Sequence, residues 1–274
     1  MPALIAPIID SAFLVALAIV IAREVIAGKN WRNLKVLGVI LVLLIANALF
    51  HYEATNAAPS GGYGARMGVA TIVFLIILIG GRIIPSVTRN WLVRQDSDRL
   101  PTPVNRFDKF AIAVSIVALL LWSVFPDFAG GRILNALAAI IHAVRLARWS
   151  GWRTVSEPLV MILHVGYAFI PLEFLLLSVR NPEQIPHAWM VGVIGVMTIA
   201  MMTRVSLGHS GRELASTGAI KVIYLSIVLA TVLRITTELL PAQPYVLYAS
   251  ATAWIAAFIS FVIVYYPILA KRRV

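Results

Sequence analysis

The sequence has no cysteine and little charge. None of its 274 residues is cysteine, which excludes disulfide bonds, thiolate-bound metals and iron–sulfur clusters. Charged residues make up 13%, whereas an average soluble domain has about 25%. P-loop, GxSxG and HExxH sequences are also absent, so nucleotide hydrolysis and the familiar hydrolase classes have no support. Any bound metal must therefore be held by His, Met, Tyr or carboxylate side chains.

The sequence is instead rich in apolar residues. The chain is 60% hydrophobic and its mean hydropathy is +0.89. Its apolar runs are long enough to cross a bilayer, which takes about 20 residues in a helix. We therefore expect an all-α polytopic transmembrane bundle, with residues 1–274 forming a single integral-membrane domain of about nine spans. The expected spans are 3–22, 34–52, 65–87, 110–128, 131–147, 159–179, 188–207, 214–239 and 245–269.

The net charge of +11 comes from basic residues in the loops. They are concentrated in alternate loops, after the first, third, fifth and seventh spans, and at the C-terminus. This asymmetry predicts an outside N-terminus and a cytoplasmic C-terminus, with membrane lipids as neighbours. Because the basic residues are not gathered on one face of a soluble domain, we do not expect nucleic-acid binding.

The five histidines are predicted to lie at two depths in the membrane. His51 and His187 fall near the outer ends of spans, and His142, His164 and His209 fall toward the inner ends. Imidazole at membrane depth marks a candidate functional site, and both haem iron and copper accept it as a ligand. Because His142 and His164 lie on neighbouring spans, a shared inner site is geometrically possible. The alternative is that each ring bonds to a backbone carbonyl or lies among lipid headgroups.

Arginines form a second candidate set. Arg82 and Arg204 each lie about one turn inside the predicted inner boundary. They either reach outward to lipid phosphates or pair with an anionic group such as a haem propionate. The glycines before Arg82 would permit a close approach. By contrast, Arg145, Arg148 and Trp149 are typical of an interfacial anchor.

The seventh predicted span carries two histidines and several methionines. At about 100° per residue, His187 and His209 would differ by only about 40° around the helix. Gly192 and Gly195 would let another helix or a flat macrocycle approach. Four methionines in this span indicate helix packing or, less often, copper ligation: Met190, Met197, Met201 and Met202. Two carboxylates in other spans suit either proton relay or pairing with a neighbouring helix: Asp10 and Glu173.

Several long blocks read together resemble the NnrS family, and they occur in that family's order. The blocks are KNWRNLK, NALFH, IGGRIIPSVTRNWL, RLARWSGWRTVSEPL, ILHVGYAFIPL and HAWMVGVIGVMTIAMMTRVSLGHSGR. The resemblance implies a bacterial inner-membrane protein that contains haem and copper. It further implies a role in nitric oxide metabolism, denitrification or resistance to nitrosative stress, with nitric oxide or a related small molecule as ligand. The residues that it points to as metal ligands or cofactor contacts are His51, His164, His187, His209, Arg82 and Arg204. The depth pattern adds His142 as a candidate metal ligand, and Tyr167, a polar residue within a span, is a further candidate cofactor contact.

The chain departs from this family at its N-terminus, where members usually carry about three further helices with an FRPFF-like start and a WHxHE-like block. We therefore expect a shortened protein, or one that needs a partner chain to supply those helices. The alternative functions are a transporter or structural membrane subunit without a redox cofactor, or an inactive fragment. Whether there is enzymatic turnover is left open.

Overall fold

A computed structural model describes residues 5–31, 34–56, 62–180, 186–239 and 243–270. Within these residues, nine helical spans are long and apolar enough to cross a membrane, as predicted. The seventh span consists of a π-helix, η3, followed by α7, and a short 3₁₀-helix, η2, precedes α6. The elements are α1 (Ile5–Ala27), α2 (Leu34–Thr55), α3 (Tyr63–Val93), α4 (Arg106–Val124), α5 (Ala129–Ala147), η2 (Gly151–Thr154), α6 (Pro158–Val179), η3 (Ala188–Val196), α7 (Met197–His209), α8 (Gly218–Leu239) and α9 (Pro244–Ala270).

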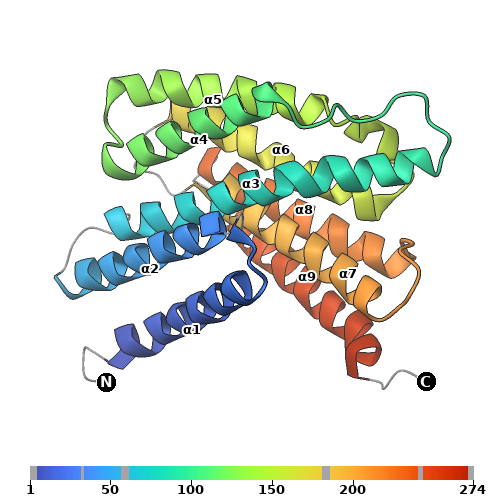
Figure 1. The fold of residues 1–274 in the computed structure, drawn as a ribbon, viewed down its shortest axis with the longest axis horizontal. Coiled ribbons are helices and arrows are strands. Elements are labelled where there is room, and N and C mark those ends of the chain that lie inside the picture. Colours follow the sequence, from blue (N-terminus) through green and yellow to red (C-terminus); the bar gives the residue numbers. More distant parts are fainter. Residues whose placement is uncertain (1–4, 32–33, 57–61, 181–185, 240–242, 271–274) are drawn as a thin grey trace.

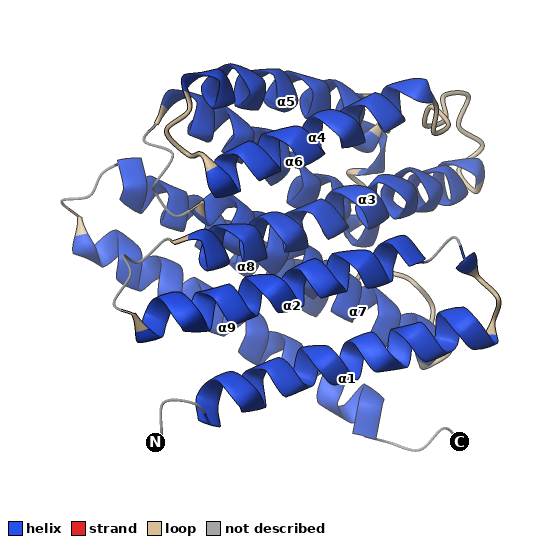
Figure 2. Cartoon of the chain, turned by 60° about the vertical axis from the view of Figure 1, so that its left-hand side comes forward, coloured by secondary structure: helices blue, strands red, loops and turns tan. Residues whose placement is uncertain are grey.

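The helices form a closed four-helix bundle with two additions. Each of α3, α4, α5 and α6 packs on the next, and α6 packs back on α3. On one side, η3 and α7 pack on α6, α8 packs on η3, and α9 packs on α8 and α7. On the other side, α2 packs on α3 and carries α1 at the edge of the molecule (Figures 1 and 2).

Burial follows this arrangement. The most buried span is α6, in which 61% of the most apolar window is buried, whereas the corresponding window of α1 has no buried residue. Large apolar side chains of α1 are exposed, and those of Phe13 and Ile19 are more than 60% exposed. A surface this apolar is suited to lipid rather than water, so the fold is that of an integral membrane protein.

Two of the differences between the observed helix ends and the predicted spans matter for the site. Helix α4 begins at Arg106, four residues before the predicted span, because Asn105 and Asp108 form a reciprocal capping box at its first turn. Helix α3 continues through Pro85 to Val93, beyond the predicted end at residue 87. These extensions bring Asp108 and Thr88 into helices that pack around the interior.

The π-helix η3 changes the expected geometry of the seventh span. A π-helix has more residues per turn than an α-helix, so the 100° rule does not relate His187 to His209. The glycines of this segment receive side chains from neighbouring helices. A Cβ on Gly192 would lie 2.5 Å from the Phe169 ring, and a Cβ on Gly195 would lie 2.5 Å from the Trp254 ring. Both close approaches are therefore helix packing.

The polar end of α7 is a Schellman motif. The helix is capped by Ser210, and Gly211 takes a left-handed φ of 71°. The Gly211 N–H donates to the Gly208 carbonyl at 3.2 Å, and the Arg212 N–H donates to the Leu207 carbonyl at 3.1 Å. These are the two bonds that define the motif. The block SLGHSGR therefore ends a helix, with His209 exposed in its last turn.

Replacing Gly211 with alanine should lower the free energy of unfolding by about 1 kcal/mol, because an L residue is strained in the left-handed region. Gly208→Ala is the matched control. Gly208 is helical with open space around its Cα, so its substitution should leave stability unchanged or raised. The measurement is thermal unfolding of the detergent-solubilised protein, and equal midpoints for the two variants would contradict the assignment.

Candidate functional site

A buried ion pair joins Arg145 of α5 to Asp108 of α4. The Arg145 Nε donates to Asp108 Oδ1 at 2.9 Å, and the two side chains are 2% and 4% exposed. The Arg145 Nη1 donates to the Ile77 carbonyl of α3 at 3.3 Å and to the Tyr167 hydroxyl of α6 at 2.9 Å. One guanidinium group therefore connects all four helices of the central bundle.

The prediction that Arg145 and Trp149 form an interfacial anchor is wrong. Trp149 is only 1% exposed and lies beside Arg145, with 5.3 Å between its ring centroid and the guanidinium carbon. Gly81 makes room for the pair, since a Cβ at that position would lie 2.2 Å from Arg145 Nη2. The close approach expected at the glycines of α3 is therefore made by an arginine of this chain. Arg148, in the same predicted anchor, is half-buried against the Phe107 ring.

The hydrogen bonds around His142 assign the position of each proton. The Ser115 hydroxyl donates to the Ala111 carbonyl at 2.7 Å, so the same oxygen accepts from His142 Nε2–H at 2.7 Å. His142 Nδ1 then accepts from the Tyr167 hydroxyl at 2.9 Å, and Tyr167 accepts from Arg145. With the protons assigned in this way, each of these hydrogen bonds has one donor and one acceptor. This assignment makes His142 a neutral imidazole with both nitrogens engaged.

His164 of α6 is held in the same way but keeps one free nitrogen. The Thr88 hydroxyl donates to the Ile84 carbonyl at 2.8 Å, so it accepts from His164 Nε2–H at 2.8 Å. His164 Nδ1 is buried and has no hydrogen-bond partner among the described residues. Gly151 of η2 covers it, because a Cβ on that glycine would lie 2.4 Å from Nδ1. The free nitrogen therefore faces backbone rather than an open cavity.

The segment that covers His164 is fastened to the loop after α3. Arg153 of η2 donates to Ser97 Oγ and to Asp98 Oδ1, each at 2.9 Å. The hydrogen bond from Arg153 and its positive charge hold the pKa of Asp98 below its usual value. Since Asp98 is exposed, this contact positions η2 with little effect on stability.

The inner histidines predicted to share a site thus bond to separate hydroxyls. An aromatic pair lies between their helices. The ring centroids of Trp149 and Tyr167 are 4.6 Å apart. The Trp149 centroid lies 6.5 Å from that of His164, and the Tyr167 centroid lies 5.9 Å from that of His142. The third member of the predicted inner layer, His209, is exposed at the end of α7.

The outer histidines are separated as well. His187 bonds to Glu238 of α8 through Nδ1, and its Nε2 accepts from Arg234 Nη2 at 2.6 Å. Arg180 also bonds to Glu238, at 2.5 Å. His51 instead belongs to α2, where its Nε2 lies 2.9 Å from Asp10 Oδ2 of α1. Asp10 is therefore paired with a neighbouring helix, one of the two expected roles for the intramembrane carboxylates.

The remaining predicted contacts are placed differently. Tyr167 is fully buried in the Arg145 network. Arg82 is exposed on α3, in a groove formed with α1 and α2, whereas Arg204 is half-buried on α7. Glu173 is buried in α6, and its Oε2 accepts from the Ala188 backbone N–H at 2.7 Å, which supports the start of η3.

His51 is the predicted ligand that best fits a haem. Haem iron needs one or two axial ligands, and a ligating imidazole usually has its other nitrogen held by a carboxylate or carbonyl. His51 meets this condition through Asp10, and it lines a groove of about 700 Å³ between α1 and α2. Both nitrogens of His142 and His187 are engaged, and the free nitrogen of His164 is covered. His51 therefore combines a carboxylate partner with an adjoining groove.

The candidate copper ligands are methionines rather than histidines. Among the described residues, no three His, Asp or Glu side chains gather closely enough to hold a metal ion. Three of the four methionines line a groove of about 440 Å³ between α3, η3 and α7, which no histidine lines: Met197, Met201 and Met202. The donors gathered there are thioethers, which suit Cu(I) among the biological metals.

The sequence carries only weak signals for the residues at the centre of the polar network. Arg145 lies in the last turn of a predicted span, where a basic side chain usually reaches outward to the lipid headgroups. Asp108 was outside the predicted span because the capping box was not recognised. Ser115 and Thr88 lie in apolar stretches, and no local signal distinguishes them from other small polar residues of membrane helices.

The fold and the buried network define a polytopic α-helical membrane protein with an ionic core. When the chain is compared with protein families, the family described as "NnrS protein" matches residues 1–273. The chain therefore belongs to the NnrS family, as the sequence blocks indicated. Searches of curated proteins and of solved structures returned no match.

Substitution of Arg145 by methionine should destabilise the protein by about 3–5 kcal/mol, because it leaves Asp108 buried without its partner. Arg148→Met is the matched control one turn away, where loss of the contact with Phe107 should cost about 1 kcal/mol or less. The double variant Asp108→Asn/Arg145→Met should be more stable than Arg145→Met alone. Thermal unfolding in detergent measures all three, and equal losses at Arg145 and Arg148 would contradict the network.

Proposed function

We propose that this chain is a haem- and copper-binding protein of nitric oxide metabolism, active in resistance to nitrosative stress. The observation that carries this proposal is the NnrS family match over residues 1–273. We place the protein in the cytoplasmic membrane of a bacterium, with the basic loops and the C-terminus in the cytoplasm. The alternation of basic loops supports this orientation.

In this proposal His51 would bind the haem iron. Asp10 holds the ring through Nε2, and Asn47 Nδ2 donates to Ser11 Oγ at 3.2 Å, which joins α1 and α2 beside the pair. The apolar groove between these helices gives the macrocycle an environment without water. When bound, the haem iron supplies the coordination position that accepts a diatomic ligand such as nitric oxide.

The proposal assigns copper to a different groove from the haem. Met197, Met201 and Met202 offer thioethers in the groove between α3 and α7. Gly80 also lines this groove, and a Cβ at that position would lie 3.6 Å from the Met197 methyl group. A soft donor set of this kind favours Cu(I).

The haem assignment is tested by the Soret absorbance of the purified protein per mole of chain. His51→Gln should abolish the band. Asp10→Asn should weaken haem affinity by roughly 10–100-fold, because the carboxylate orients the ligand. His209→Gln is the control, since that imidazole is exposed at a helix end. Addition of nitric oxide should shift the Soret band of the wild type and of the control.

Two results would contradict this assignment. If His51→Gln keeps the haem content of the His209→Gln control, His51 is not the ligand. If the wild type, expressed with ample haem, shows no Soret band, the described helices do not hold the cofactor.

A further inference from the structure

A groove at one end of the bundle has the features of a site for a charged amphiphile. It has a volume of about 610 Å³ and lies between the last turns of α1, the start of α2 and the middle of α3. Its walls are apolar, with Ile21, Val25 and Ile83 among them, and its rim carries the basic side chains Lys35 and Arg82. Neither basic residue forms an ion pair with another described residue.

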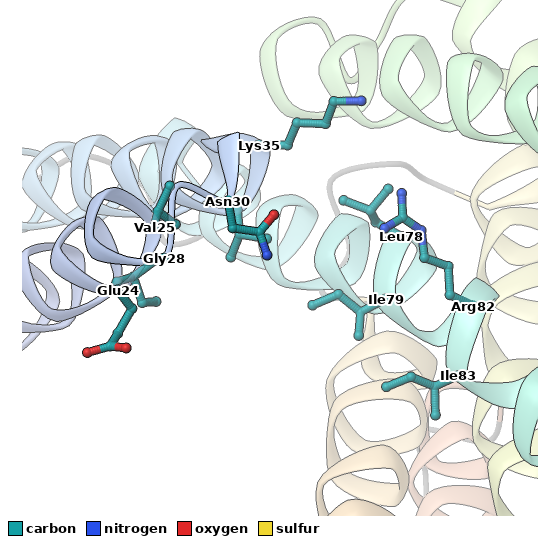
Figure 3. A pocket seen from close by; sticks show the side chains of 11 residues that line it. Glu24, Val25, Gly28, Asn30, Lys35, Leu78, Ile79, Arg82 and Ile83 are labelled. Carbon is teal, nitrogen blue, oxygen red and sulfur yellow. The ribbon is translucent and has the colours of Figure 1, made fainter. Parts of the chain in front are cut away.

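The charged groups are arranged to receive an anion. Figure 3 shows Lys35 extending from α2 and Arg82 extending from α3 toward the same space, while the Glu24 carboxylate points away from it. Asn30 adds an amide to the lining. Two positive charges therefore lie at the edge of an apolar groove, and the one lining carboxylate is not paired with either of them.

The depth of the groove matches a headgroup region. Helix α3 has 31 residues and is therefore about 46 Å long, which exceeds the hydrocarbon thickness of about 30 Å. Counted from Tyr63, about 30 Å of helix ends near Arg82. The end of α1 and the start of α2 lie at the same level, because residues of both line the groove together with Arg82.

We propose that this groove binds an acidic phospholipid, with Lys35 and Arg82 holding the phosphate and the apolar wall receiving the upper part of an acyl chain. Basic pockets between membrane helices select anionic headgroups in this way. No histidine lines the groove, so Arg82 is assigned to a lipid phosphate rather than to a haem carboxylate. This site does not depend on the haem or copper of the proposed function.

The experiment measures lipid binding to the full chain in detergent by native mass spectrometry, with phosphatidylglycerol and phosphatidylcholine as probes. The wild type should prefer phosphatidylglycerol. Lys35→Gln/Arg82→Gln should lose the preference and bind phosphatidylglycerol roughly 30-fold more weakly. The matched control is Arg23→Gln/Lys29→Gln, which removes the same charge at the same end of α1 without touching the groove lining. It should retain the wild-type affinity.

A second variant keeps the test independent of the folding of the first. Val36→Trp places a bulky ring in the groove without removing charge, and it should also displace phosphatidylglycerol. Equal losses in the two double variants would mean general attraction to the basic surface and would overturn the proposal. It would also be overturned if Lys35→Gln/Arg82→Gln lowered haem content while phosphatidylglycerol binding stayed unchanged.

Discussion

The ion pair between Arg145 and Asp108 is the constraint on which the rest of the interior depends. An isolated guanidinium or carboxylate is costly at membrane depth, so the two must be paired and their remaining hydrogen-bonding groups must be satisfied. Arg145 also donates hydrogen bonds to a carbonyl of α3 and to the hydroxyl of Tyr167. Asp108 also accepts a hydrogen bond from the Asn105 backbone N–H at the start of α4. Each helix that offers an atom is thereby fixed in rotation and depth. Gly81 is part of the same constraint, because any side chain there would meet the guanidinium.

This constraint decides what the buried histidines can do. Tyr167 uses its single proton on His142, which directs the opposite nitrogen to Ser115. His164 follows the same rule with Thr88. The imidazoles of the central bundle thus act as hydrogen-bonding members of its core. The groups to which the proposals above assign ligands line grooves outside this core: His51, Arg82 and the methionines of α7.

The number and type of the helices could be predicted because run length and bilayer thickness are directly related. The family could be predicted because its blocks are long and ordered. The hydrogen-bond partners in the interior could not be predicted from the sequence. Depth can be counted along a helix, but direction around the helix requires a regular repeat, and η3 breaks that repeat between His187 and His209. The sequence favours an outward-pointing Arg145, because a basic residue in the last turn of a span usually reaches the headgroups. Only the position of Asp108, set by a capping box beyond the predicted span, shows that it points inward.

The most direct test of this account is the protonation pattern of the interior histidines, read from ¹⁵N chemical shifts of histidine-labelled protein by solid-state NMR in a bilayer. The hydrogen bonds predict that His142 and His164 are neutral and protonated at Nε2, with His142 Nδ1 accepting a hydrogen bond and His164 Nδ1 free. Shifts of an imidazolium, of the opposite tautomer or of a metal-bound ring at His142 would contradict the account.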